Sequence, residues 1–474
     1  MTAPSSIHYY RNTKHLCALS RQSGRRSPFF ILSTLSLLLL FLTGCAMQSN
    51  FYAGVEKNMG SGNFTEASKQ IQKNKNSFGT KSDVLYNLEM GTLLHYAGKY
   101  EESNSNLFEA ERRMDELFTK SITEQASSFL LNDNVLPYEG EDFEKVFVNL
   151  FLALNYACMD NFEDALVEAR KVDVKLNEFS RKYDGKNCYK EDALVRYLMG
   201  AMYESGGELN DAYISYVKAY EGYQDYEKLY GTHAPSFLQD DLIRTAGLLG
   251  FKDDLRRYEK LFNKQFQRPS SAQGSAIVII YSGKGPIKQE VKISPTIPDK
   301  DGMPHTFAIA VPKFQARMKS DRRYTVSLAN SPANASIAAE VGQNITKIAE
   351  KDLNDRLTLI YLKAGGRALL KFLAVEAAKG GLKKDKKDKK DKKNKDSQIG
   401  NILFGALLDV AYSASEQADV RTWRSLPHQI QVARIFAPSG SYTLSVTSSG
   451  RTVTTVPVDV RSQKATFKVI PDVN

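Results

Sequence analysis

The strongest constraint on the fold is residues 193–220, which read as two helices joined by a short turn. Small residues stand where the two helices must touch, at Gly200, Ala212 and Ala219. Large residues stand where the gap must be filled, at Tyr203 and Tyr216. One such hairpin cannot bury its own apolar stripe, so copies must stack to make a continuous core. The run therefore predicts a stack of helix pairs.

Weaker copies of this pattern recur between residues 51 and 262. Their central residues are Phe64 and Ala67, then Gly91 and Ala110, then Tyr156 and Ala165, and finally Gly250 and Tyr258. A Gly and an aromatic residue on one helix, followed by a small and an aromatic residue on the next, resemble a tetratricopeptide repeat. The resemblance implies an α-solenoid over residues 45–266, in which the last, degenerate copy serves as the terminal capping repeat.

The periodicity changes from helix to strand after residues 267–274, a polar, Pro-containing stretch that we interpret as a linker. Strands are predicted at 275–281, 289–293, 306–311, 324–329, 357–362, 429–436, 442–447, 453–460 and 465–470. Two helices rich in small and apolar residues are predicted at 366–379 and 399–414, joined by a Lys/Asp-rich linker at 383–396. The predicted fold class is α+β and multidomain: the solenoid, then a β-rich, sandwich-like domain at 275–474 with a helical insertion at 364–417.

The first 44 residues read as an export leader. Basic residues precede an apolar run at 29–42, which is too short to cross a bilayer of ~30 Å as a helix. The run ends in Leu42-Thr43-Gly44-Cys45, which resembles a bacterial lipobox. The resemblance implies lipidation of Cys45, and Ala46 after it implies the outer membrane, facing the periplasm. The alternative is an ordinary secreted protein with a chance cysteine.

The formal net charge of +10 is concentrated in two places. The leader carries five basic residues and no acidic residue, and residues 383–396 carry nine Lys against four Asp. The remainder is close to neutral, so no folded face is predicted to be basic and nucleic acid is not an expected partner.

Catalytic chemistry has little support in the sequence. The histidines have no metal-ligand spacing, and no G-x-S-x-G, P-loop or paired-cysteine motif occurs. We therefore expect no enzyme activity, no metal and no cofactor. A disulfide between Cys158 and Cys188 stays open, because it requires the loop between them to fold back.

Repeat arrays of this kind typically bind partners on the concave face, which the first helix of each pair lines. The corresponding positions are Leu88, Thr92, His95, Tyr96, Leu150, Leu154, Ala157, Tyr197, Ala201 and Glu204. Aromatic and polar groups in this mixture suit an extended or helical peptide. Insertions at 117–140 and 182–191 are also positions that could contact a ligand. The alternative is that the C-terminal half or these insertions fill the groove.

Three further segments resemble a family of bacterial tetratricopeptide-repeat lipoproteins: YEGEDFE at 138–144, VEAR at 167–170, and ADVRTW at 418–423. The resemblance implies an envelope location and no enzyme activity, but the family brings no known ligand. Within these segments, Glu141 or Glu144 could pair with Arg170. Trp423, beside Arg421, could anchor the fold or meet a partner.

Our functional hypothesis from the sequence is a lipid-anchored envelope scaffold that binds a protein or peptide in its repeat groove, in outer-membrane assembly or cell-wall synthesis. This process is chosen by analogy of architecture alone. The alternative hypothesis is a structural membrane-associated component whose helices at 366–379 and 399–414 insert in the bilayer.

Overall fold

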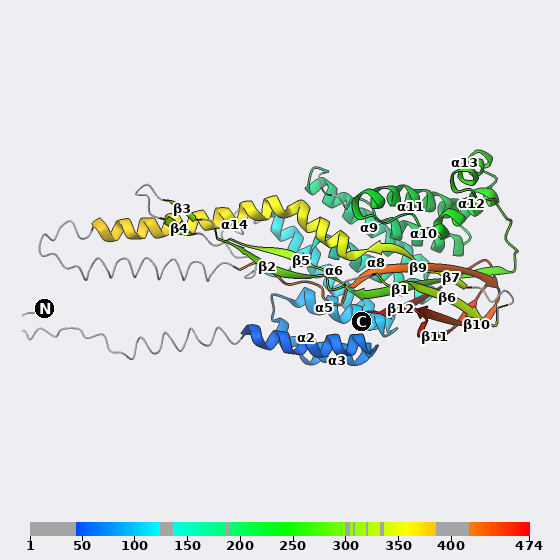
Figure 1. Ribbon diagram of the computed structural model, residues 1–474, viewed down its shortest axis with the longest axis horizontal. Coiled ribbons are helices and arrows are strands. Elements are labelled where there is room, and N and C mark those ends of the chain that lie inside the picture. Colours follow the sequence, from blue (N-terminus) through cyan, green and yellow to red (C-terminus); the bar gives the residue numbers. More distant parts are fainter. Residues whose placement is uncertain are drawn as a thin grey trace, which may run out of the picture. The chain divides into compact units, whose positions relative to one another are not determined.

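Residues 51–474 form one compact unit in the computed structural model (Figure 1). The structure describes residues 44–123, 136–298, 304–318, 321–384 and 417–474, except residues 186, 188, 295, 307–308 and 332–335. The leader up to Thr43, Cys188, the Lys/Asp run beyond Lys384 and the predicted helix at 399–414 lie outside the described residues.

Consecutive helices make up the N-terminal half, as the repeat pattern predicts. They are α2 (Gly44–Gly60), α3 (Phe64–Lys73), α4 (Lys75–Phe78), α5 (Asp83–Tyr96), α6 (Tyr100–Thr123), α8 (Asp142–Cys158), α9 (Phe162–Lys182), α10 (Ala193–Ser205), α11 (Leu209–Tyr230), α12 (Ser236–Leu249) and α13 (Lys252–Phe262). Each of α5, α8, α10 and α12 packs on the helix that follows it, and α6, α9 and α11 pack on the next pair. The helical half is therefore a stack of pairs, and its repeat-like character follows from this packing.

The packing of α10 on α11 shows why small residues recur. A Cβ added to Gly200 would lie 2.4 Å from a ring carbon of Tyr216, so only glycine lets the two helices approach this closely. Gly91 on α5 has the same relation to Leu107 on α6, at 2.6 Å. The small-against-large pairing predicted from the sequence is thus confirmed in two of the helix pairs.

The C-terminal half contains two four-stranded sheets. The first, which we call the inner sheet, has the order β12 (Ala465–Asp472), β1 (Gln273–Lys284), β9 (Pro427–Pro438) and β8 (Glu340–Asn344). The second has the order β11 (Arg451–Val460), β10 (Gly440–Ser448), β6 (Tyr324–Ala329) and β7 (Ser336–Ala338). Two ribbons, β2 (Ile287–Ile293) with β5 (Ile309–Gln315) and β3 (Thr296–Pro298) with β4 (Pro304–Thr306), complete the described strands. Among the described strands, only β1 and β12 pair in parallel.

Strand β1 is buried on both faces, which explains its continuous apolar run. Its odd-numbered residues join the core of the helical half: Ile277, Ile279 and Tyr281. Its even-numbered residues join the core between the two sheets: Ala276, Val278 and Ile280. Side chains alternate between faces along a strand, so a single strand serves both cores. The inner sheet therefore lies between the helix pairs and the second sheet, and hydrophobic packing continues across the stretch predicted as a linker.

Helix α14 (Ile345–Lys384) corrects two predictions. Residues 357–362, predicted as a strand, are helical, and the helix begins well before residue 364. Its inward residues follow helical spacing through Leu353, Leu357 and Ile360, whereas Leu359 and Leu362 are exposed. Periodicity alone cannot tell whether a short apolar run is a strand or a helix. Here the inward positions continue at helical spacing over a longer stretch, which identifies a helix. None of the helices in the described part of the chain is both long and apolar enough to span a membrane.

The Gly200 contact predicts that Gly200→Ala destabilises the protein. Alanine gains about 1 kcal/mol of helix propensity over glycine. Overpacking against the buried Tyr216 ring costs about 1–3 kcal/mol, so a net loss in the free energy of unfolding is expected. The matched control is Gly365→Ala in α14, where nothing lies within 4 Å of the added Cβ and a small gain is expected. Urea unfolding measures both, and a Gly200→Ala protein as stable as the wild type would contradict the packing argument.

Candidate functional site

The groove positions predicted from the repeats do lie together, but they are not open to solvent. Leu88, Thr92, His95, Tyr96, Leu150, Leu154, Ala157, Tyr197 and Ala201 are all at most 5% exposed, and only Glu204 is partly exposed. Strands β1 and β9 of the inner sheet, together with residues 418–426, cover them. A partner could reach these side chains only if those segments left the groove.

His95 is enclosed by the inner sheet. Its Nε2 lies 2.9 Å from the Tyr281 hydroxyl on β1, and its Nδ1 lies 2.5 Å from Oδ1 of Asn155 on α8. Burial lowers the pKa of His95 to about 4, so the ring is neutral at ordinary pH. A neutral ring that donates from Nδ1 to Asn155 can accept at Nε2 from Tyr281. In this structure His95 therefore joins two repeats to the sheet.

Glu204 is the second link between groove and sheet. Arg434 on β9 donates to Glu204 at 3.0 Å and to Asp241 on α12 at 2.7 Å, and Arg244 contacts both carboxylates. Burial opposes ionisation of Glu204, but the charges of Arg434 and Arg244 hold its pKa at about 2. Two cations and two anions thus balance each other in a nearly closed site, and removal of one would leave a buried charge unpaired.

Residues 418–426, which we call the crossing segment, lie in the groove in the manner of a bound peptide. The Glu89 carboxylate accepts the backbone N–H of Arg424 at 2.8 Å and that of Ser425 at 3.1 Å. Glu144 accepts the backbone N–H of Trp423 at 3.0 Å. Side chains of the groove thus take up main-chain donors, as in sites that bind extended chains.

Trp423 is the anchor of the crossing segment. It is 1% exposed, its ring lies 5.6 Å from that of Phe151, and its indole N–H donates to the Thr92 hydroxyl at 2.8 Å. Arg421 donates to the backbone oxygens of Lys81 and Leu136, each at 3.1 Å. Both residues predicted as interaction anchors therefore contact the repeats of their own chain.

The predicted pairing of Glu141 or Glu144 with Arg170 is wrong. Glu141 forms ion pairs with Lys288 on β2, at 2.6 Å, and with Arg356 on α14. Glu144 accepts the Tyr138 hydroxyl at 2.6 Å as well as the crossing segment. The cations near Glu141 come from elements 147 and 215 residues away in sequence, which local spacing cannot reveal.

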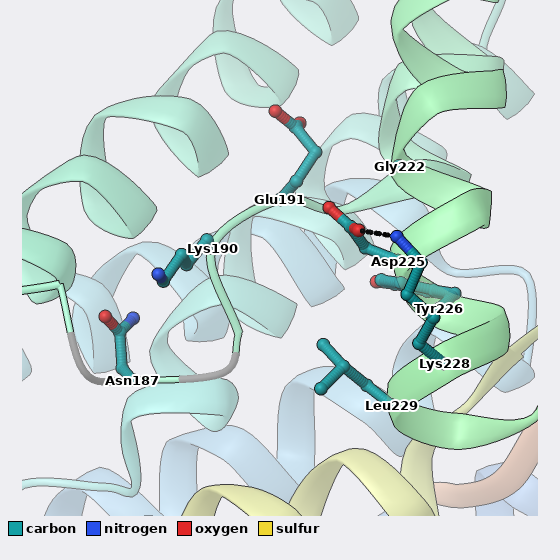
Figure 2. Close-up of a pocket in the computed structure, with 8 residues that line it drawn as sticks. All are labelled: Asn187, Lys190, Glu191, Gly222, Asp225, Tyr226, Lys228 and Leu229. Carbon is teal, nitrogen blue, oxygen red and sulfur yellow. Dashed lines mark hydrogen bonds and ion pairs between the residues drawn. The ribbon is translucent and has the colours of Figure 1, made fainter.

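An open pocket of about 330 Å³ lies between α11 and the loop before α10 (Figure 2). It is lined by Asn187, Lys190, Glu191, Gly222, Asp225, Tyr226, Lys228 and Leu229. Asp225 and Lys228 form an ion pair at 3.1 Å at its side. α11 is the second helix of its pair, so this pocket is separate from the filled groove. The polar insertion at 182–191 was the sequence signal that pointed to this place.

Buried polar contacts fix the loop that borders the pocket. Tyr189 donates its hydroxyl to Asp192 at 2.5 Å, and the Gln343 amide donates to the same carboxylate at 2.7 Å. Asp192 also caps α10 by accepting the backbone N–H of Val195. The loop that carries Lys190 and Glu191 is therefore held in place by these contacts.

Metal and thiol chemistry are not indicated at these sites. The described residues contain no group of three or more His, Cys, Asp or Glu side chains that could hold a metal ion. Cys158 is a free thiol, and burial raises its pKa to about 12, which keeps it protonated.

Comparisons with known proteins give limited similarity. No family model matches the chain, and no curated protein matches it. Two solved structures of the TPR-like repeats of a putative kinesin light chain from Podosopora anserina align over 46% of this chain and 94% of theirs, with 11% identity and a TM-score of 0.29. A structure described as MamA MSR-1 C2 aligns over 46% of this chain and 95% of its own, with 13% identity and a TM-score of 0.26. These TM-scores are low, so the assignment of helical repeats rests on the helix packing described above.

The contact between Glu89 and the crossing segment predicts that Glu89→Gln loosens that segment. A glutamine offers one acceptor and one donor, so one of the two backbone N–H groups loses its partner, at a cost of about 1–3 kcal/mol. Trp423 is the only tryptophan in the chain, so its emission reports on this site alone. We expect a red-shifted emission and stronger acrylamide quenching than in the wild type. Glu66→Gln, at an exposed position of α3, is the control, and equal spectra for all three proteins would contradict the prediction.

Proposed function

We propose that this protein is a lipid-anchored scaffold that holds a protein partner at the bacterial envelope. The single observation that carries the proposal is the pocket on α11, because it is a built recess that the fold itself leaves unfilled. The groove, by contrast, holds the crossing segment and the inner sheet. The partner site we propose is therefore the outer side of the repeats.

The chemistry of the pocket suits a peptide loop of mixed character. Lys190 and Lys228 offer positive charge, Glu191 and Asp225 offer negative charge, and Leu229 is 37% exposed. Its volume is near the lower end for ligand pockets, which fits one or two side chains of a protein partner better than a large cofactor. Charges of both signs at the rim would select the partner and fix its orientation.

The envelope location rests on the resemblance of residues 42–45 to a lipobox and of the longer segments to tetratricopeptide-repeat lipoproteins. Lipid on Cys45 would tether the chain to the outer membrane, with the folded unit in the periplasm. Outer-membrane assembly or cell-wall synthesis is the process we propose, by analogy of architecture. An envelope protein or peptide is the partner, and nucleic acid is not.

A second candidate function is a structural component that inserts in the bilayer through the helices at 366–379 and 399–414. One observation favours it: Leu359, Leu362, Leu369 and Leu370 of α14 are exposed. A contiguous apolar surface of this kind commonly meets another protein or a membrane.

Cys45→Ala distinguishes the two candidates. If lipid on Cys45 is the only anchor, the variant leaves the membrane fraction and appears in the periplasmic extract, because nothing else holds it. If helices insert, the variant stays in detergent extracts of the membrane. Cell fractionation with mass spectrometry of the N-terminal peptide is the measurement. A Cys45 peptide without acyl chains in the wild type would contradict the lipid anchor.

Substitutions in the pocket test the partner site. Residues 51–474, which form the compact unit, serve as bait for envelope extracts. The double variant Lys190→Glu, Asp225→Lys reverses two rim charges, and we expect it to lose a protein that the wild type retains. Arg256→Glu on α13 is the control, because its side chain is 75% exposed and does not line the pocket. Equal retention by all three baits would defeat the proposal.

A further inference from the structure

Exposed apolar side chains gather on elements that contact one another. In the described part of the chain, fourteen large apolar side chains are exposed, and eight of them lie on β2, α14 or the crossing segment. α14 packs on β5, which pairs with β2, and the three elements run side by side (Figure 1). Apolar surface concentrated in this way marks a contact with another protein or with a membrane. We call the following six side chains the apolar patch: Val291, Ile293, Leu359, Leu362, Leu369 and Leu370.

The part of the patch on α14 occupies one side of the helix. At about 100° per residue its four leucines fall within an arc of about 100°. Leu362 is 64% exposed, whereas Leu353, Ala364 and Ala368 on the opposite side are buried against the unit. A helix with one apolar side turned outward has the form of helices that lie in a membrane interface.

Basic side chains border the patch. Lys363 falls just beyond the edge of the leucine arc, and Lys292 and Lys313 are exposed on the ribbon of β2 and β5. The sequence of α14 from Lys363 to Lys384 contains six basic residues and one acidic residue. Apolar groups bordered by cations complement the acyl chains and phosphates of a phospholipid surface. A second copy of this chain would instead bring the same positive charges together.

The amino-terminal end of the unit lies near the patch. Arg424 of the crossing segment stacks on the Tyr52 ring of α2, 4.5 Å from its centre. The first N–H of the crossing segment donates to Glu290 on β2 at 2.7 Å, so this segment connects α2 with the patch. Cys45 stands seven residues before Tyr52, a span of at most about 25 Å even for an extended chain. Lipid on Cys45 would therefore hold a bilayer within reach of β2.

We infer that the apolar patch rests on the surface of a phospholipid bilayer, with its leucines among the outer parts of the acyl chains and the bordering lysines at the phosphates. For the nearness of the bilayer the inference rests on the proposed lipid anchor. A short tether makes the second contact intramolecular, so a patch of modest area suffices to keep it. Two points of attachment would fix which side of the unit faces the membrane.

An environment-sensitive dye on the full chain tests this contact. The three native cysteines other than Cys45 are replaced by serine, and unchanged Trp423 emission confirms that this background is folded. Nitrobenzoxadiazole is attached to Leu362→Cys in the patch. Val174→Cys on α9 is the matched control, because Val174 is 61% exposed and lies outside the patch. Each chain is reconstituted in vesicles of phosphatidylethanolamine and phosphatidylglycerol.

We expect the emission of the dye at position 362 to shift to shorter wavelength in vesicles, while that at position 174 stays unchanged. Lipids with a nitroxide near the headgroup should quench position 362 more than lipids with a nitroxide deep in the acyl chain. Equal responses at the two positions would overturn the inference. Stronger quenching by the deep nitroxide would also overturn it, because the helix would then be inserted. A shift without nitroxide quenching would mean that another copy covers the patch.

Mass spectrometry of the Cys45 peptide in the same samples separates this inference from the proposed anchor. Acylated Cys45 without quenching at position 362 would overturn the inference and leave the anchor standing. Free Cys45 together with quenching at position 362, repeated in a Cys45→Ser chain so that only position 362 carries dye, would overturn the anchor and leave the inference standing.

Discussion

The burial of β1 on both faces is the constraint on which the rest of the structure depends. One side of the strand packs on the first helices of the repeats and the other on the second sheet. Neither half could be removed without exposing a row of large apolar side chains to water, at about 25 cal/mol per Å². Residues 51–474 therefore behave as one unit, although the helices up to α13 precede all the described strands.

Buried charges fix how the two halves fit together. Arg434 reaches from the inner sheet to carboxylates on two helices, and Lys288 and Arg356 meet at Glu141. Apolar packing tolerates small shifts, whereas a buried ion pair that loses its partner carries a large desolvation penalty. These contacts thus favour the observed position of the sheet on the helices over shifted positions.

Residue spacing along the sequence predicted individual helices and strands of this fold. It could not predict the contacts between elements that are far apart in the chain. Gly200 and Tyr216 are close in sequence, so their spacing revealed the helix pairs; the concave positions from Leu88 to Glu204 followed from the same register. β6 was placed at its observed bounds because alternation suffices for a half-buried strand. From the sequence, a groove filled by the C-terminal half was only an alternative to an open groove. The filling depends on contacts of Tyr281 and Arg434 with helices far away in the chain, which spacing does not reveal. The apolar run at 357–362 was misread because its length fits either structure.

The parallel pairing of β1 with β12 has a consequence for biosynthesis. β12 is the last of the described strands, and β9 follows β1 only after more than a hundred residues. During elongation the helix pairs and β1 are complete long before β9 and residues 418–426, which cover the rest of the concave side, have emerged. For that interval the nascent repeats present a partly uncovered aromatic channel, which makes this stage the most exposed to aggregation and to capture by chaperones.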